Sequence, residues 1–486
     1  MSATREPTIL QALLPIGVLT ALLGLAVYLF GADASYGPNQ IGLLAATAVA
    51  LAVGARNGIA WKNLQDAVAR SITVASGAIF ILLVVGSVIG VWILSGTVPT
   101  LIHYGLALLN PSVFYLASCL ICALIGLAIG SSWTVAGTIG IGLMGVAQAQ
   151  GLNPGMAAGA IISGAYFGDK MSPLSDTTNL APAVAGSELF EHIRHMTWTT
   201  LPAFVVALIL FGLIGINAAA SDISPELARL PAVLAQEFAL GPHLLLPMIL
   251  VLVMAWRRIP ALICLAVGVV AGAVFAVLFQ PEQVARIGAA LDRGAAMAMV
   301  SGVWQVLFSG YSGESGLAAL DELLNRGGMA NMMNTVWIIL CALAFGGAME
   351  KSGLLQRLIL SLMRRVKTAG GLVATTVLTA FGINAIASDQ YISIVISGRM
   401  YKLEYERLGL DSLNLSRAVE DGGTVTSVLV PWNSCGAYMA ATLGVSTWAY
   451  APYAFLNWIC PVLAVAMALT GFRILRQQGR AAQPAC

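Results

Sequence analysis

Long apolar segments with almost no charge set the strongest limit on what this chain can fold into. Segments long enough to cross a bilayer lie at about 9–30, 40–55, 72–95, 198–219, 243–256, 260–279, 335–350 and 450–472, and a spanning helix needs about 20 apolar residues. Of the 486 residues, 58% are hydrophobic and only 9% are charged, whereas soluble domains carry roughly 25% charged residues. The sequence therefore predicts an all-α polytopic membrane protein with the lipid bilayer as its partner, and it excludes a soluble enzyme. The net charge of +2 gives no basic field for nucleic acid.

Four further apolar stretches are interrupted by clusters of Ser, Thr, Asn, Asp or Gly. They cover residues 113–150, 154–196, 371–398 and 412–447. Broken helices are tolerated at membrane depth only where the freed backbone faces protein or a watery cavity. We therefore expect the functional residues at these four interruptions.

The two halves of the chain resemble each other. With a shift of 257 residues, Gly90 and Ser95 fall on Gly347 and Ser352, and with a shift of 252 Asp169 falls on Asp421. The connection 96–112 has no Lys or Arg, whereas its counterpart 351–371 carries Lys351, Arg357, Arg364, Arg365 and Lys367. The positive-inside rule places these connections on opposite sides of the membrane, so we expect an inverted repeat, as in many secondary transporters.

A complete layout follows if 113–150 and 371–398 are re-entrant hairpins and the broken helices 154–196 and 412–447 cross fully. It gives about ten transmembrane helices plus two hairpins, in a cell membrane, with both termini in the cytoplasm. The first repeat is then 1–220, the external linker 221–242 and the second repeat 243–486. Most of the 24 Lys and Arg residues then face the cytoplasm.

The first polar motif runs from Gly168 to Asn179 and combines two carboxylates, an ammonium group, hydroxyls and an amide. Pro173 lacks a backbone donor and breaks the helix. An unwound helix offers the carboxylate, hydroxyl and carbonyl oxygens that bind Na⁺. The candidate cation and proton ligands here are Asp169, Ser172, Asp176, Thr177 and Asn179.

The second motif, from Glu420 to Asn433, again combines a carboxylate with glycines, hydroxyls, a proline and an amide. Its candidate ligands are Asp421, Thr424, Thr426 and Asn433. The predicted hairpin tips add Ser131, Ser132 and Thr134 in one half and Asn384, Ser388 and Asp389 in the other.

Several basic residues allow more than one interpretation. Lys170 is either a structural counter-ion for Asp169 or Asp176, or a charge that competes with the bound cation. His192 and His195 flank Arg194 in a segment that we interpret as a solvated amphipathic helix end, although their i,i+3 spacing also suits a metal or a pH sensor. Lys170 is the only cation expected at membrane depth.

The longest motif resembles the NhaC-type Na⁺/H⁺ antiporter family. It reads Gly164-Ala165-Tyr166-Phe167-Gly168-Asp169-Lys170-Met171-Ser172-Pro173-Leu174-Ser175-Asp176. Three shorter motifs carry the same resemblance: Ala387-Ser388-Asp389-Gln390-Tyr391, Glu420-Asp421-Gly422-Gly423-Thr424 and Pro431-Trp432-Asn433-Ser434. It implies Na⁺/H⁺ exchange on an inverted-repeat scaffold with paired hairpins. It also leaves open a Na⁺- or H⁺-coupled exchanger or symporter of a small organic acid or amino acid, such as malate or lactate.

The working hypothesis is competition at shared carboxylates, which bind Na⁺ when ionised and H⁺ when neutral. Asp169 acts with Asp176, or with Asp421 across the repeat interface, and an elevator or rocking motion exposes the site alternately. The only metal expected is transported Na⁺, with no cofactor and no enzymatic reaction. A homodimer is compatible with the sequence. A short match to a membrane serine protease, Gly310-Tyr311-Ser312-Gly313, lacks a His at membrane depth.

Overall fold

The computed structural model describes residues 5–31, 34, 36–218, 225–289, 294–364, 366 and 368–477. These residues form helices and short connections, with one isolated bridge between Leu410 and Arg476. The first half contains α1 (Ile9–Phe30), α2 (Pro38–Arg56), α3 (Trp61–Val74), α4 (Ser76–Leu94), α5 (Thr97–Leu108), α6 (Phe114–Ile129), α7 (Ser132–Val135), α8 (Ile141–Ala149), α9 (Pro154–Met171), α10 (Asp176–Ala185), α11 (Leu189–Ala218) and α12 (Pro225–Glu237).

The second half continues the series with α13 (Leu246–Trp256), α14 (Ala261–Phe279), α15 (Pro281–Gly288), α16 (Ala295–Ser309), α17 (Ala318–Leu324), α18 (Met333–Lys351), α19 (Leu354–Met363), α20 (Ala369–Ala387), α21 (Gln390–Arg407), α22 (Ser412–Val419), α23 (Val425–Ser427), α24 (Ser434–Leu443), α25 (Thr447–Tyr450) and α26 (Phe455–Thr470). Two π-helical segments, η3 (Ala136–Gly140) and η7 (Glu420–Thr424), interrupt α-helical geometry. The predicted all-α fold is confirmed.

Eight helices in the described residues are long and apolar enough to span a membrane, or up to 10 if two bent pairs each count as one span. The predicted multi-pass membrane protein is therefore confirmed. α1 shows how such a helix is stable: Leu10 is 77% and Tyr28 84% exposed, which suits a surface that faces lipid rather than water. α9 and α22–α24 are not among these helices, and their membrane crossing stays a prediction.

Both predicted helix breaks are present. α9 ends at Met171 and α10 begins at Asp176, with Pro173 between them and Ser175 as the N-cap that accepts from the Thr178 amide at 3.3 Å. In the second half, α22 passes into η7 and α23, and a turn precedes α24, which Asn433 caps. The freed backbone groups are satisfied by side chains at these caps.

The two halves share an order of elements. α4 and α18 each end in a Ser-Gly pair with left-handed Gly96 (φ 81°) or Gly353 (φ 72°). A helical hairpin follows in each half, and its turn is a left-handed residue, Gly130 or Ser388, followed by an extended N-cap. This likeness supports an internal repeat. Its inverted orientation and the re-entrant position of the hairpins stay predictions, and Arg365 and Lys367, which helped to predict the orientation, lie outside the described residues.

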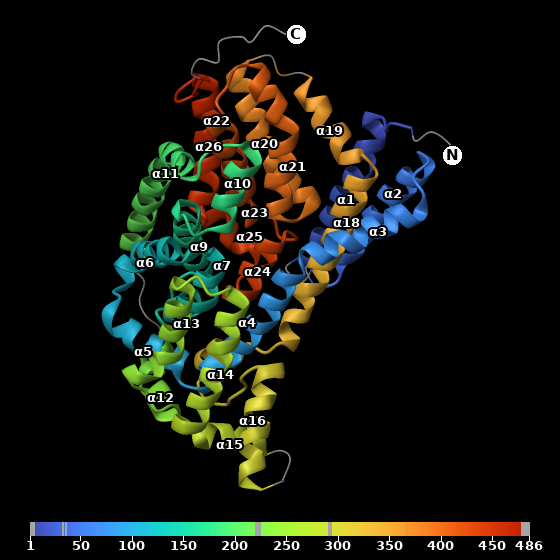
Figure 1. The fold of residues 1–486 in the computed structure, drawn as a ribbon. Helices are drawn as coiled ribbons and strands as arrows, with labels where there is room; N and C mark the ends of the chain where they lie inside the picture. The colour runs from blue at the N-terminus through green and yellow to red at the C-terminus, as the bar shows by residue number, and fades with distance from the viewer. Residues whose placement is uncertain are drawn as a thin grey trace.

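Close backbone packing joins the first hairpin to the first broken helix. α6 lies against α9, and a Cβ added at Gly164 or Gly168 would meet the Cys119 carbonyl oxygen at 2.1 Å or the Ala123 carbonyl oxygen at 2.5 Å. In Figure 1, α7, α9, α10, α23 and α24 gather at the centre, α12 and α15 lie toward the lower end, and α19, α20 and α22 reach the upper end. The two broken helices thus meet in the interior of the molecule.

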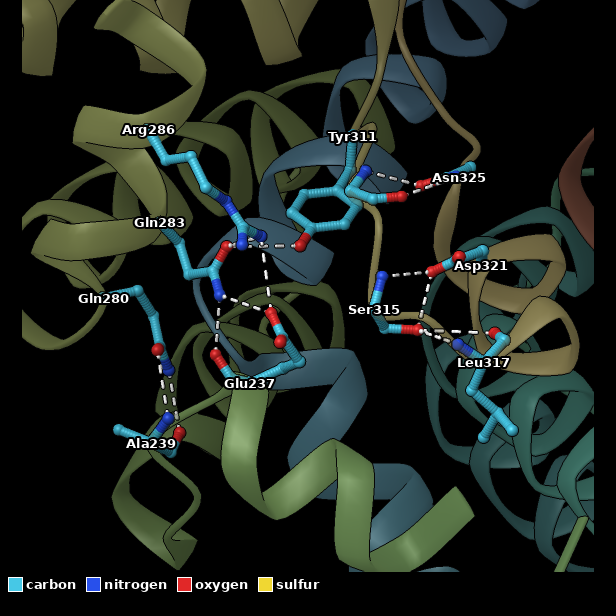
Figure 2. Close-up of polar contacts among 11 residues, drawn as sticks. Glu237, Ala239, Gln280, Gln283, Arg286, Tyr311, Ser315, Leu317, Asp321 and Asn325 are labelled. Carbon is cyan, nitrogen blue, oxygen red and sulfur yellow. Dashed lines mark hydrogen bonds and ion pairs between the residues drawn. The ribbon is translucent and has the colours of Figure 1, made fainter. Parts of the chain in front are cut away.

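The end of the molecule that contains α12 and α15 is held together by a polar network (Figure 2). Gln283 donates to the Glu237 carbonyl oxygen at 2.7 Å, and Arg286 pairs with the Glu237 carboxylate at 3.4 Å. The loop 310–317 is fixed by Asn325, which accepts from the Gly313 amide, and by Asp321, which accepts from Ser315. The segment that resembled a protease motif is therefore part of a structural turn. The predicted linker 221–242 contains helix α12, and its residues 221–224 lie outside the described part of the chain.

Candidate functional site

A cavity of about 280 Å³ lies where the first broken helix meets both hairpin turns. We call it the carboxylate cavity. Of the residues predicted to bind a cation, it is lined by Ser131, Asp169, Asp176, Thr177 and Asp389. It is also lined by Ala75, Gly77, Ala78, Ile81, Gly130, Trp133, Ser175, Ala261, Gln390, Tyr391 and Ser434. These lining residues include three carboxylates and no Lys, Arg or His.

Asp169 is held by the start of the helix after the first hairpin turn. Its side chain is buried, and one carboxylate oxygen accepts from the Ser132 amide at 3.0 Å and the Ser132 hydroxyl at 2.7 Å. Backbone N–H groups at a helix N-terminus favour negative charge. Both hydrogen bonds from Ser132 go to this one oxygen, so Asp169 is fixed in place while its second oxygen is not used by Ser132.

Asp389 lies in the turn of the second hairpin itself and is the N-cap of α21. Its carboxylate caps α21 by accepting from the amides of Tyr391 (2.9 Å) and Ile392 (3.1 Å), and Ser434 donates to its other oxygen at 3.3 Å. Asp176 begins α10, is exposed, and interacts electrostatically with Asp169. Among the described residues no three His, Cys, Asp or Glu side chains are close enough to hold one metal ion together. A bound hard cation would therefore take one or two carboxylates and complete its shell with hydroxyl and carbonyl oxygens.

Lys170, the next residue after Asp169, points to a different partner. It forms an ion pair with Asp421, both side chains being 0% exposed. Thr199 and Cys460 also donate to the same Asp421 oxygen, each at 3.2 Å. Lys170 is therefore the counter-ion of Asp421 in the second broken helix, rather than of Asp169 or Asp176.

Two further charged residues beside this pair correct our expectations. Arg417 was not among the residues expected to be buried, yet it is only 1% exposed, and none of its guanidinium nitrogens has a hydrogen-bond partner among the described residues. Glu420 is 0% exposed, and neither of its carboxylate oxygens has such a partner. Lys170 is thus not the only buried cation in the described residues. The spacing of Arg417 to Glu420 and Asp421, i,i+3 and i,i+4, places these residues on one helix face and was the signal available in the sequence.

The expected amphipathic helix end is solvated on one face only. Glu191 and Arg194 are exposed, whereas His192 and His195 lie on the opposite, buried face and are 0% and 5% exposed. The Nδ1 atom of His192 lies 2.8 Å from the Ser416 hydroxyl. Hydropathy alone does not reveal this burial, since it depends on the packing of α22 against α11.

The other predicted site residues lie outside the lining of the carboxylate cavity. Asn384 donates to the Gly423 carbonyl oxygen at 2.5 Å and to Thr426, and Asn433 donates to the Asn384 carbonyl oxygen at 3.1 Å. These three residues tie the second hairpin to the unwound backbone. The remaining members are engaged locally or buried elsewhere: Thr134 contacts Ser131, Ser172 accepts from Leu174, Asn179 donates to Pro173, and Ser388 and Thr424 are buried.

Comparison with known proteins places this geometry in a family context. The family model described as "Na+/H+ antiporter family" matches residues 164–472. The chain is 36% identical to "Na(+)/H(+) antiporter NhaC" of Alkalihalophilus pseudofirmus, covering 98% of this chain and 99% of the relative. It is 35% identical to "Malate-2H(+)/Na(+)-lactate antiporter" of Bacillus subtilis, covering 97% and 96%. It is 36% identical to "Arginine/ornithine antiporter ArcD" of Halobacterium salinarum, covering 97% and 93%.

Proposed function

This chain belongs to the Na⁺/H⁺ antiporter family, and from that premise we propose that it exchanges Na⁺ for H⁺ across the cell membrane by alternating access. The observation that carries the proposal is the carboxylate cavity, in which Asp169, Asp176 and Asp389 face one space without a basic side chain. Uncompensated carboxylates at close range are costly unless a cation or protons neutralise them. The protein acts as a carrier without cofactor or enzymatic reaction.

Competition between Na⁺ and H⁺ takes place at Asp169 and Asp176. The ionised pair binds Na⁺ together with hydroxyl groups of the lining, and protonation of the same pair releases the ion. Support comes from the different restraint of the two groups: Asp169 is fixed by Ser132, whereas Asp176 is exposed. One fixed and one movable carboxylate allow the coordination shell to open without unfolding either helix.

The repeats supply the motion. In this proposal 1–220 and 243–486 are inverted repeats, both termini are cytoplasmic, and the two hairpins move with the broken helices. The Lys170–Asp421 pair joins the first broken helix to the second, so the movements of the two are coupled. Both hairpin turns line the carboxylate cavity, which supports a shared path for the ion.

The test uses proteoliposomes in which an imposed Na⁺ gradient drives proton movement, read by an internal pH dye. Asp169→Asn keeps the size of the side chain but cannot ionise, and we expect it to abolish exchange. The matched control is Asp66→Asn, which removes a carboxylate from the exposed face of α3. Normal exchange by Asp169→Asn, or equal loss in both variants, would refute the proposal.

A second function, exchange of a small organic acid or amino acid coupled to Na⁺ or H⁺, has support of its own. The names of two relatives include malate and lactate, or arginine and ornithine. The carboxylate cavity, with a volume of about 280 Å³, is also larger than the ~30 Å³ that one water molecule occupies. Counterflow of labelled malate or arginine in the same proteoliposomes decides between the two: flux that requires the organic solute favours the second function.

A further inference from the structure

A second cavity, separate from the carboxylate cavity, lies at the start of α11 and has a volume of about 610 Å³. Its walls come from the first turns of α11, the start of α22 and the chain that follows α26. The layout predicted from the charge pattern, with both termini in the cytoplasm, puts all three on the cytoplasmic side. We call it the arginine cavity, because Arg194, Arg473 and Arg476 line it.

The walls of the arginine cavity are held by a defined set of hydrogen bonds. The chain after α26 runs beside the start of α22: the Asp411 amide donates to the Leu475 carbonyl oxygen at 3.1 Å, and the Gln477 amide donates to the Gly409 carbonyl oxygen at 3.0 Å. Asn414 exchanges two further hydrogen bonds with the Leu475 backbone, at 2.7 and 3.0 Å. The segment that carries Arg473 and Arg476 is therefore fixed against α22.

The electrostatics of the arginine cavity favour an anion. None of its three arginines forms an ion pair within the described residues. Its two acids are Glu191 and Asp411, and the Asp411 carboxylate is engaged as a helix cap that accepts from Leu413 at 2.9 Å. Guanidinium groups bind phosphate oxygens in a bidentate manner, so the three arginines suit a phosphate group.

A buried, unpartnered nitrogen points to the same ligand. His195 lines the cavity, is 5% exposed, and its Nε2 atom has no hydrogen-bond partner among the described residues. A buried polar atom without a partner costs free energy, and a phosphate oxygen would satisfy it when Nε2 carries the proton. His195 also interacts electrostatically with Arg417 and Arg473, which adds positive charge around the position that the anion would occupy.

The mouth of the arginine cavity has the aromatic side chains of a membrane interface. Arg473 stacks over the Trp198 ring at 3.9 Å, and Trp198 and Phe472 are 41% and 52% exposed. Tryptophan is enriched at the level of lipid headgroups, and basic pockets at the cytoplasmic ends of helices bind anionic headgroups. We propose that the arginine cavity binds a phosphate group, supplied by the headgroup of an anionic phospholipid of the cytoplasmic leaflet.

The test measures binding to the full-length protein in neutral detergent by native mass spectrometry, so it does not depend on exchange activity. The probes are short-chain phosphatidylglycerol, short-chain phosphatidylcholine, glycerol 3-phosphate and inorganic phosphate. Phosphatidylglycerol is expected to bind and phosphatidylcholine to bind weakly. The double variant Arg473→Gln/Arg476→Gln should weaken phosphatidylglycerol binding roughly thirtyfold, because each basic residue near an anionic lipid contributes about a factor of five.

The matched control is Arg56→Gln/Arg257→Gln, which removes the same charge from exposed helix ends outside the cavity and should leave binding unchanged. If the first double variant is not folded, Arg476→Gln alone, at an exposed side chain, should still lose about fivefold. Equal loss in the control, or no preference for phosphatidylglycerol over phosphatidylcholine, would overturn the proposal. Binding of glycerol 3-phosphate and inorganic phosphate as tight as that of the lipid would overturn the lipid source and retain the phosphate site.

Discussion

The buried pair Lys170–Asp421 gives the sharpest energetic prediction. Lys170→Met and Asp421→Asn each leave one charge at a position that is 0% exposed. Breaking a buried ion pair on one side costs about 3–5 kcal/mol, because the remaining charge is desolvated without compensation, whereas replacing both partners is often neutral. The double variant Lys170→Met/Asp421→Asn should therefore be more stable than either single variant.

The surroundings of the pair predict an asymmetry between the single variants. Without Lys170, Asp421 keeps hydrogen bonds from Thr199 and Cys460 and the electrostatic attraction of Arg417. Without a charge at Asp421, Lys170 and Arg417 are two buried cations that have lost a common carboxylate, and Lys170 keeps the electrostatic attraction of Glu420. We expect Asp421→Asn to lower the free energy of unfolding by about 5 kcal/mol and Lys170→Met to lower it by about 3 kcal/mol.

The assay is equilibrium unfolding of the four proteins in mixed micelles, combined in a double-mutant cycle. The exposed pair Arg407–Glu404, at 2.7 Å, is the control, and its loss should cost no more than about 1 kcal/mol. Additive effects of the two buried substitutions, or single costs no larger than that of the control, would refute the reasoning.

Three further predictions test packing and charge elsewhere. Gly168→Ala should lower the free energy of unfolding by about 1–3 kcal/mol, because its Cβ would meet the backbone of α6 at 2.5 Å. The control Gly382→Ala should not destabilise, since its Cβ meets nothing within 4 Å in the described residues. Thermal unfolding in detergent compares the two variants. Hydrogen bonds from the first turn of α11 hold the pKa of Glu188 below its ordinary value of 4.5, so the stability that the carboxylate contributes is present above that pH and lost as the pH falls through the lower, folded value. The protection factors of the amides in that turn, which correct for the pH dependence of intrinsic exchange, should fall on acidification in the parent protein, and in Glu188→Gln they should be low already at neutral pH. Arg417→Met should leave the free energy of unfolding unchanged or raise it by up to about 3 kcal/mol, since it removes a buried guanidinium without hydrogen bonds; a loss of stability in the same unfolding assay would contradict this.

The helical fold and the positions of its breaks could be predicted from the sequence because they depend on local chemistry. Apolar length predicted α1, α4 and α14, and Pro173 predicted the end of α9, since a missing N–H acts on its own helix. The carboxylate cavity was partly predictable for the same reason. Asp169, Asp176 and Asp389 are ionisable residues in apolar surroundings, and such residues are expensive unless they are functional.

The partner of each polar residue was harder to predict from the sequence, because it depends on segments that are distant along the chain. Lys170 is adjacent in sequence to Asp169, yet it pairs with Asp421, 251 positions away. Arg417 lies at the end of a polar segment and is buried because α10, α11, α20 and α21 pack against α22. Asn384 and Asn433 have the composition of ion ligands, and the folded backbone instead uses them to satisfy groups freed by the helix break.

The adjacency of Asp169 and Lys170 suggests how ion binding in one half is felt in the other. Both residues lie in the last turn of α9, but Asp169 lines the carboxylate cavity and Lys170 contacts the second broken helix. A rotation or shift of this turn that improves the coordination of a cation by Asp169 must also move the ammonium group relative to Asp421. Among the residues that the structure describes, Asp421 has one oxygen without a hydrogen-bond partner and Glu420 beside it has two, so acceptors for a displaced ammonium group are already in place. A protein with Lys170→Met should therefore still bind Na⁺ at Asp169, while the movement that exposes the site on the other side is slowed. Normal Na⁺ binding with reduced exchange is the result that this coupling requires, and loss of both together would assign Lys170 to the binding site itself.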